Sequence, residues 1–245
     1  MKHLLNLLAA IALLVWGTHL VRTGVLRVLG SRLRQVLAAS MSNRFTAALS
    51  GLGVTALVQS STATALITSS FVGRGLIALP AALAVMLGAD IGTAVMAVVF
   101  SFDLSWLSPL FIFVGVTLFI LRQGTPVGDV GRVLIGLGLM LLALQLVSQA
   151  THVLTANPAV QLMLESLTSD RMLEILVGAT LAVLSYSSLA VVLLTATLAI
   201  NVVGIDVALG LVLGANLGSG LLAVLTTAKA NLATRQVPLG NLLFK

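Results

Sequence analysis

Residues 85–101 read VMLGADIGTAVMAVVFS, and residues 211–227 read LVLGANLGSGLLAVLTT. The two stretches match at their glycines, with Gly88 opposite Gly214, which sets an offset of 126 residues. Extended upstream without a gap, this offset places Gln59-Ser60-Ser61-Thr62 opposite Ser185-Tyr186-Ser187-Ser188, and residues 7–24 opposite the apolar segment 133–150. A polar cluster, a glycine motif and an apolar span that share one register indicate an internal repeat.

The composition is that of a membrane protein. Apolar residues make up 59% of the 245 residues and charged residues 8%, against about 45–50% and about 25% in soluble domains. These values exclude a soluble enzyme, a disordered chain and a nucleic-acid-binding domain, since the 13 Lys and Arg residues form no dense basic patch. The absence of cysteine excludes disulfides and thiolate sites. No nucleophile–base–acid arrangement is visible, so we expect neither an enzyme nor a cofactor.

The apolar stretches predict an all-α, polytopic helical bundle. Residues 4–21 form the first predicted span, and the arginines and leucines of residues 22–44 predict a basic amphipathic helix on the membrane surface. Two stretches crowded with Ser, Thr and small residues, 45–73 and 172–200, are predicted to enter the membrane, break and return as re-entrant hairpins. The remaining predicted spans are residues 75–101, 106–121, 133–150 and 205–228.

Three predicted spans separate equivalent points of the repeat, and an odd number inverts the second copy. The charges agree, because the arginine-rich segment 22–44 and the loop 122–132 then share the cytoplasmic side. Inverted repeats with broken helices are typical of secondary transporters, so we predict a multi-pass transporter in the lipid bilayer.

The repeat also divides the chain. Residues 1–126 are the predicted first repeat, with a span, an amphipathic helix, a hairpin and two spans, and residues 127–245 are the inverted second repeat. By the same offset, segment 106–121 should recur at 232–247. The second repeat is therefore expected to be truncated at its C-terminal end, with further residues following Lys245.

The polar clusters lie inside apolar hairpins. A helix broken at Gln59–Thr62 exposes N–H groups and the positive end of a helix dipole, which suit an anion, and serine and threonine hydroxyls add donors. Such hydroxyls can also bond to carbonyls of their own helix or join helices together. Two clusters at equivalent positions favour a binding role over these structural roles.

Asp90 is the acidic residue deepest inside a predicted span, and a carboxylate there is a functional-site hypothesis. It would bind a cation, carry a proton or pair with an arginine, and the absence of arginine from that span favours the first two. Thr93 and Ser219 would add hydroxyl oxygens, which hard cations prefer, and neutral Asn216 stands opposite Asp90 in the second copy. The three histidines are scattered, so no transition-metal site is expected.

Taken together, Gln59-Ser60-Ser61-Thr62, Leu87–Thr93 and Leu213–Ser219 resemble the motifs of the type II sodium/phosphate cotransporter family. Members carry two Gln-Ser-Ser-type motifs in inverted repeats, each followed by a Gly-Ala-Asn-Ile-Gly-Thr-type motif. The second copy departs from the pattern, with Ser185 where Gln is expected and Tyr186 where Ser is expected. The first glycine motif carries Asp90 in place of the commoner Asn, and the second carries Leu217 and Ser219.

The resemblance implies sodium-coupled symport of inorganic phosphate in the bacterial inner (plasma) membrane. It assigns phosphate to residues of both Gln-Ser-Ser-type motifs, namely Gln59, Ser60, Ser61, Thr62, Ser187 and Ser188. Sodium, the coupling ion, would take oxygen ligands from Gln59, Asp90, Thr93, Asn216 and Ser219. Bacterial members often carry a PhoU-like helical domain after the membrane core, so such a domain is a further expected partner.

Two alternatives stay open. The chain could transport another anion, or couple transport to protons through Asp90. It could also be a non-transporting membrane component that senses phosphate, because the second motif lacks its glutamine.

Overall fold

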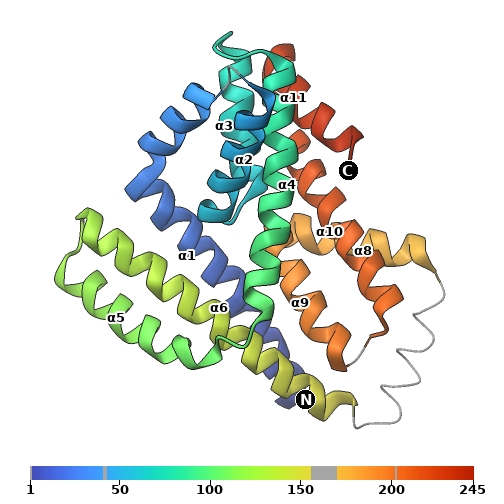
Figure 1. Ribbon diagram of the computed structural model, residues 1–245. Coiled ribbons are helices and arrows are strands. Elements are labelled where there is room, and N and C mark those ends of the chain that lie inside the picture. The colour runs from blue at the N-terminus through green and yellow to red at the C-terminus, as the bar shows by residue number, and fades with distance from the viewer. Residues whose placement is uncertain (1, 41–42, 156–169, 202) are drawn as a thin grey trace.

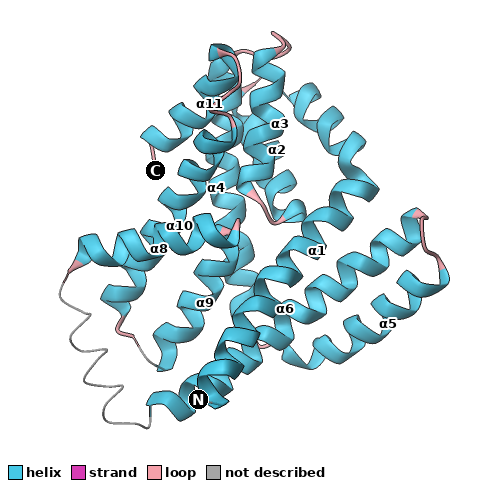
Figure 2. Cartoon of the chain, turned by 180° about the vertical axis from the view of Figure 1, so that it is seen from behind, coloured by secondary structure: helices cyan, strands magenta, loops and turns pink. Residues whose placement is uncertain are grey.

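The computed structural model describes residues 2–40, 43–155, 170–201 and 203–245 (Figure 1). Every regular element in these ranges is helical, as predicted (Figure 2). The helices are α1 (Lys2–Ala39), α2 (Arg44–Val58), α3 (Ser61–Gly73), α4 (Leu79–Ser101), the short 3-10 helix η2 (Ser105–Leu107), α5 (Ser108–Leu121), α6 (Pro126–Thr155), α8 (Arg171–Ser185), α9 (Ser188–Asn201), α10 (Ile205–Thr226) and α11 (Leu232–Leu243). Residues 156–169 of the predicted second repeat lie outside the described ranges.

Helix α1 corrects one expectation. The predicted boundary between a span at 4–21 and a surface helix at 22–44 is absent, because α1 continues from Lys2 to Ala39. No proline interrupts this segment, and Val21, Val25 and Leu33 continue a buried stripe along the helix. Helix α1 packs along α6, where Gly17 and Gly136 each lie against the carbonyl of the other.

Four described helices are long and apolar enough to cross a membrane: α1, α4, α6 and α10. The predicted span at 106–121 is shorter than expected, because α5 has 14 residues and a helix of that length rises about 21 Å. A bilayer core is about 30 Å thick. The chain is thus an all-α, multi-pass membrane protein, and the inverted orientation of its halves stays a prediction.

Each predicted hairpin segment contains two helices joined by a two-residue break, and the re-entry of these segments into the membrane stays a prediction. In the first, α2 and α3 meet at Gln59 and Ser60; in the second, α8 and α9 meet at Tyr186 and Ser187. Among the residues that the structure describes, Gln59 and Tyr186 are the non-glycine residues with positive φ, at 55° and 53°. The left-handed backbone at each helix end turns the chain and leaves the N-terminus of the next helix free.

The two halves repeat their helix contacts. Gly88 of α4 lies against the Ala48 carbonyl of α2, and Gly214 of α10 lies against the Ile175 carbonyl of α8. One turn further on, a Cβ built on Gly92 would lie 2.6 Å from the Leu52 carbonyl oxygen. The equivalent Cβ on Gly218 would lie 2.5 Å from the Ala179 carbonyl oxygen. Helix α2 therefore packs on α4, and α8 packs on α10, through equivalent glycine contacts.

These contacts correct the register of the second polar motif. Helices α4 and α10 keep the offset of 126 residues, but the hairpins match at 127, which places Gln59 opposite Tyr186. Ser60 and Ser61 then stand opposite Ser187 and Ser188, so Ser185 does not replace the glutamine. Counted from the first residue of the helix after the break to the glycine motif, the second half is one residue shorter, since Ser61 precedes Gly88 by 27 residues and Ser188 precedes Gly214 by 26. A gap-free alignment hides this difference.

The halves also contact each other across the molecule. Helix α3 of the first half contacts α10 of the second, and α9 of the second contacts α4 of the first. The buried core runs through both halves, with Leu14 of α1, Met86 of α4, Met140 of α6, Leu193 of α9 and Val237 of α11. Helices α3 and α9, which begin at the two polar breaks, are thus held within one core.

Candidate functional site

The first break is built by Gln59, Ser60 and Ser61, which are all buried. Gln59 ends α2, donating its backbone N–H to the Thr55 carbonyl at 2.7 Å, and the Ser60 hydroxyl accepts the Ala63 N–H at 3.2 Å. The Gln59 side-chain oxygen is buried and has no hydrogen-bond partner within the described residues. The first turn of α3, which includes half-buried Thr62, therefore presents free N–H groups beside an unpartnered amide oxygen.

The second break repeats this geometry. The Ser187 hydroxyl accepts the Ala190 N–H at 3.1 Å, as Ser60 does for Ala63. Ser60 and Ser187 therefore cap α3 and α9, which is a structural role that the sequence analysis did not consider. The hydroxyls of Ser61 and Ser188 differ, since they have no hydrogen-bond partner among the described residues.

Arg22 of α1 reaches the second break. Its Nη2 donates to the Tyr186 carbonyl at 2.8 Å, while its buried Nε has no hydrogen-bond partner in the described part of the chain. The sequence placed Arg22 in a surface helix, so no cation was expected near either motif. A guanidinium fixed beside Ser187 adds the positive charge that binding an anion requires.

The two breaks rest on chemically different supports. Behind the first break, the hydroxyls of Thr55 and Thr64 hydrogen-bond at 2.8 Å in a buried contact between α2 and α3. At the equivalent positions of the second hairpin, Ala182 and Val191 pack in a small apolar cluster with Ala215. The first hairpin is therefore joined by a hydrogen bond and the second by apolar packing.

Asp90, Asn216 and Ser219 converge, but on a side chain that the sequence analysis did not consider. The Lys245 ammonium lies 2.9 Å from an Asp90 carboxylate oxygen and donates to the Ser219 hydroxyl at 2.7 Å. It also donates to the Asn216 backbone carbonyl at 3.3 Å. Of the three roles considered for Asp90, the structure shows pairing with a basic side chain, and that side chain is a lysine.

Gln59 and Thr93, the other two cation candidates, are not brought to this cluster. The Thr93 hydroxyl donates to the Ala89 carbonyl of its own helix at 3.2 Å. Gln59 stays at the first break, with its side-chain oxygen buried. The predicted cation ligands thus divide into an Asp90–Ser219 group that joins α4 to α10 and separate positions at Gln59 and Thr93.

Glu174 of α8 is a buried carboxylate that the sequence analysis missed. It is 6% exposed, packs against Gly210 of α10, and its Oε2 has no hydrogen-bond partner among the residues described. The equivalent positions of the first half hold Ala47 and Ala84, both buried. The second half thus has a glutamate and a glycine where the first half has two alanines. This equivalence follows from the hairpin offset of 127 residues and is missed with the single offset of 126.

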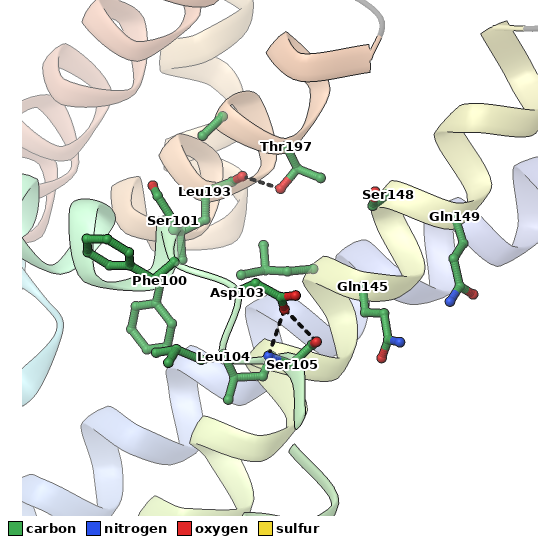
Figure 3. A pocket seen from close by; sticks show the side chains of 14 residues that line it. Phe100, Ser101, Asp103, Leu104, Ser105, Gln145, Ser148, Gln149, Leu193 and Thr197 are labelled. Atoms are coloured by element: carbon green, nitrogen blue, oxygen red, sulfur yellow. Dashed lines mark hydrogen bonds between the residues drawn. The ribbon is translucent and has the colours of Figure 1, made fainter. Parts of the chain in front are cut away.

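A cavity of about 470 Å³ opens between the α4–α5 connection, α6 and α9 (Figure 3). Its polar lining includes Asp103, Gln145, Ser148 and Thr197. The Ser105 hydroxyl and N–H donate to the Asp103 carboxylate and lower its pKa, so the carboxylate stays charged at neutral pH. Thr197 lies about 14 Å along α9 from Ser188 by helix rise, so the cavity is separate from the breaks.

The comparisons with known proteins agree with the sequence motifs. Residues 13–149, more than half of the chain, match the family model described as Na+/Pi-cotransporter. The chain belongs to the sodium/phosphate cotransporter family.

Family relatives are similar over the whole chain. It is 58% identical over 246 residues to proteins of Escherichia coli (strain K12) and Salmonella typhimurium that are both named "Putative inorganic phosphate export protein YjbB". It is 22% identical to "Uncharacterized protein YqeW" of Bacillus subtilis, covering 98% of this chain and 78% of that protein. The chain spans about half the length of the YjbB relatives, of which it covers 45%. No solved structure matches it.

The description of the family model names cotransport and the name of the YjbB relatives names phosphate export, and neither names an enzymatic activity. The matched region runs from residue 13 to residue 149, so it holds most of α1, all of α2 to α5 with the first break, and most of α6. The second break and the Lys245 cluster lie beyond it.

Proposed function

We propose that the chain forms the membrane core of a transporter for inorganic phosphate, with one phosphate bound between the two hairpin breaks. One observation supports this most: the two breaks have the same construction, and the unpartnered hydroxyls of Ser61 and Ser188 stand at equivalent positions. Each begins a helix whose first N–H groups are free to bind an anion. The name of the YjbB relatives and the family membership favour phosphate as the anion.

The charge of phosphate needs compensation in a buried site. Two helix N-termini contribute partial positive charge, and the Arg22 guanidinium adds a full one beside Tyr186. Its free Nε can donate a charge-assisted hydrogen bond to a phosphate oxygen. In this proposal, Ser61 and Ser188 donate hydroxyl hydrogen bonds, Ser60 and Ser187 hold the helix ends in place, and Gln59 and Thr62 complete the first break.

Sodium as the coupling ion is the second part of the proposal. The unpartnered Gln59 oxygen and the Thr93 hydroxyl offer oxygen ligands in the first half, and the Asp90–Asn216–Ser219 group would offer more where the Lys245 ammonium is displaced. A bound cation would favour phosphate by direct attraction and would couple the two fluxes. The cavity beside α9 would admit water, and its Asp103 carboxylate favours cations there. The direction of net flux then follows the gradients.

Radiolabelled phosphate flux into proteoliposomes that hold the full chain tests the proposal. We expect flux that rises with an inward sodium gradient and falls at least tenfold in the Ser61→Ala/Ser188→Ala variant. Ser70→Ala is the matched control, because the Ser70 hydroxyl donates to the Ile67 carbonyl of its own helix, away from both breaks. Flux that ignores sodium but rises with acid would favour proton coupling. Tight phosphate binding without flux would favour a sensing component.

A further inference from the structure

The Lys245 ammonium contacts three oxygen atoms from two helices. Its neighbours are an Asp90 carboxylate oxygen at 2.9 Å, the Ser219 hydroxyl at 2.7 Å and the Asn216 carbonyl at 3.3 Å. All three are oxygens, one of them charged, and they come from α4 of the first half and α10 of the second. Oxygen sets of this kind also bind hard cations such as sodium.

The Lys245 side chain is buried in a space that Gly220 of α10 leaves open. Lys245 is 1% exposed at its side chain, and Asp90 is 20% exposed. A Cβ built on Gly220 of α10 would lie 3.3 Å from the Lys245 Cδ, so the missing side chain leaves room for the lysine stem. Removing the ammonium alone would leave a carboxylate inside an apolar bundle without a counter-charge, which is strongly unfavourable.

We propose that Lys245 is a tethered cation that fills a position otherwise open to a sodium ion. The Lys245 ammonium then neutralises the Asp90 carboxylate. A sodium ion binds beside Asp90 only when the lysine side chain has left. This inference rests on the proposed function, because it concerns the cation side of the same transporter. It predicts that neutralising Lys245 creates a new sodium dependence.

The test uses thermal unfolding of the purified full chain, without phosphate, in sodium chloride and in choline chloride of equal ionic strength. Four proteins are compared: the wild type, Lys245→Gln, Lys245→Arg and the double variant Asp90→Asn/Lys245→Gln. Lys245→Arg keeps the charge and is the matched control. The double variant removes both charges and with them the reason for a cation to bind.

In Lys245→Gln, we expect a lower Tm in choline and a sodium-specific recovery that exceeds that of the wild type by about 3 °C or more. Lys245→Arg and the double variant should gain no more from sodium than the wild type does. In flux measurements, Lys245→Gln should depend more steeply on sodium.

Equal sodium gains in Lys245→Gln and the wild type would overturn the proposal. So would a Lys245→Gln protein that stays unfolded in both salts, because sodium would then fail to replace the ammonium. A sodium gain retained in the double variant would place the ion away from Asp90 and would equally contradict it. Since unfolding is measured without phosphate, absence of phosphate flux in the wild type would count against the proposed function and leave this test unaffected.

Discussion

Gln59 and Tyr186 hold the same left-handed backbone conformation at equivalent points of the two hairpins, with φ of 55° and 53°. Each ends one helix and precedes the serine that caps the next, Ser60 or Ser187. A left-handed conformation costs an L-residue roughly 1–2 kcal/mol. Both halves have it at the polar break, although the side chains differ, because the chain turns there between two helices. The relation also sets the register in which the halves must be compared.

Glycine should therefore be tolerated at these two positions, and valine should not. Gln59→Val and Tyr186→Val should each lower the stability by about 1–2 kcal/mol, since a β-branched residue resists positive φ. Gln59→Gly and Tyr186→Gly should leave Tm unchanged or raise it. Leu57→Gly, in the regular part of α2, is the control and should lower stability by about 1 kcal/mol. Equal losses for glycine and valine would contradict the backbone argument.

Arg22 should contribute to phosphate affinity from outside both motifs. Replacing it with Gln removes a charged donor beside the second break, which should weaken phosphate binding about 10- to 100-fold if the lost bond is worth about 1.5–3 kcal/mol. Arg27→Gln is the control on the same helix, because Arg27 pairs with Asp129 at an exposed position. Isothermal titration with phosphate measures both. An unchanged Kd in Arg22→Gln would remove the residue from the site.

The glycines that seat the hairpin helices should be intolerant of a methyl group. Gly88→Ala and Gly214→Ala would each drive a Cβ into a backbone carbonyl of the facing helix, Ala48 or Ile175. Overpacking of this kind costs about 1–3 kcal/mol. Gly53→Ala is the control, because nothing lies near its Cβ position, and it should stabilise α2 slightly. Thermal unfolding in detergent distinguishes the three, and a harmless Gly88→Ala would contradict the close packing.

Glu174 and Gly210 should be coupled. Gly210→Ala alone places a methyl group against the Glu174 carboxylate and should lower the Tm by several degrees. The double variant Glu174→Ala/Gly210→Ala copies the Ala47 and Ala84 pair of the first half and should recover most of the loss. A double-mutant cycle of unfolding energies measures the coupling. Additive effects of the two changes would show that the contact is unimportant.

The helical class, the two broken-helix segments and the matching glycine contacts of α4 and α10 could be predicted from the sequence, and the inversion of the repeat stays a prediction. They depend on local patterns: long apolar segments, polar clusters inside them, and Gly88 and Gly214 in matching motifs. The hairpin register could not be predicted without coordinates, because one missing residue before α10 has no signature in a gap-free comparison. The structure locates it through backbone contacts.

The contacts of single charged side chains could not be predicted from the sequence either, for a different reason. Arg22 reads as part of a basic surface helix until α1 is seen to continue past the second break. Lys245 lies 155 residues from Asp90, and nothing local links the two. Glu174 looks like a first-turn residue of α8, yet the absence of a side chain on Gly210 buries it. Each contact depends on packing between segments distant in sequence.

The central claim is that the two breaks together form one phosphate site. Equilibrium binding of radiolabelled phosphate to the purified full chain tests it most directly, with Ser61→Ala, Ser188→Ala, their combination and the Ser70→Ala control. The account predicts one phosphate per chain, a weaker Kd in each single variant, near-complete loss in the double variant and no change in the control. Two independent phosphates, each lost with one serine, or an unaltered Kd in Ser188→Ala would contradict it.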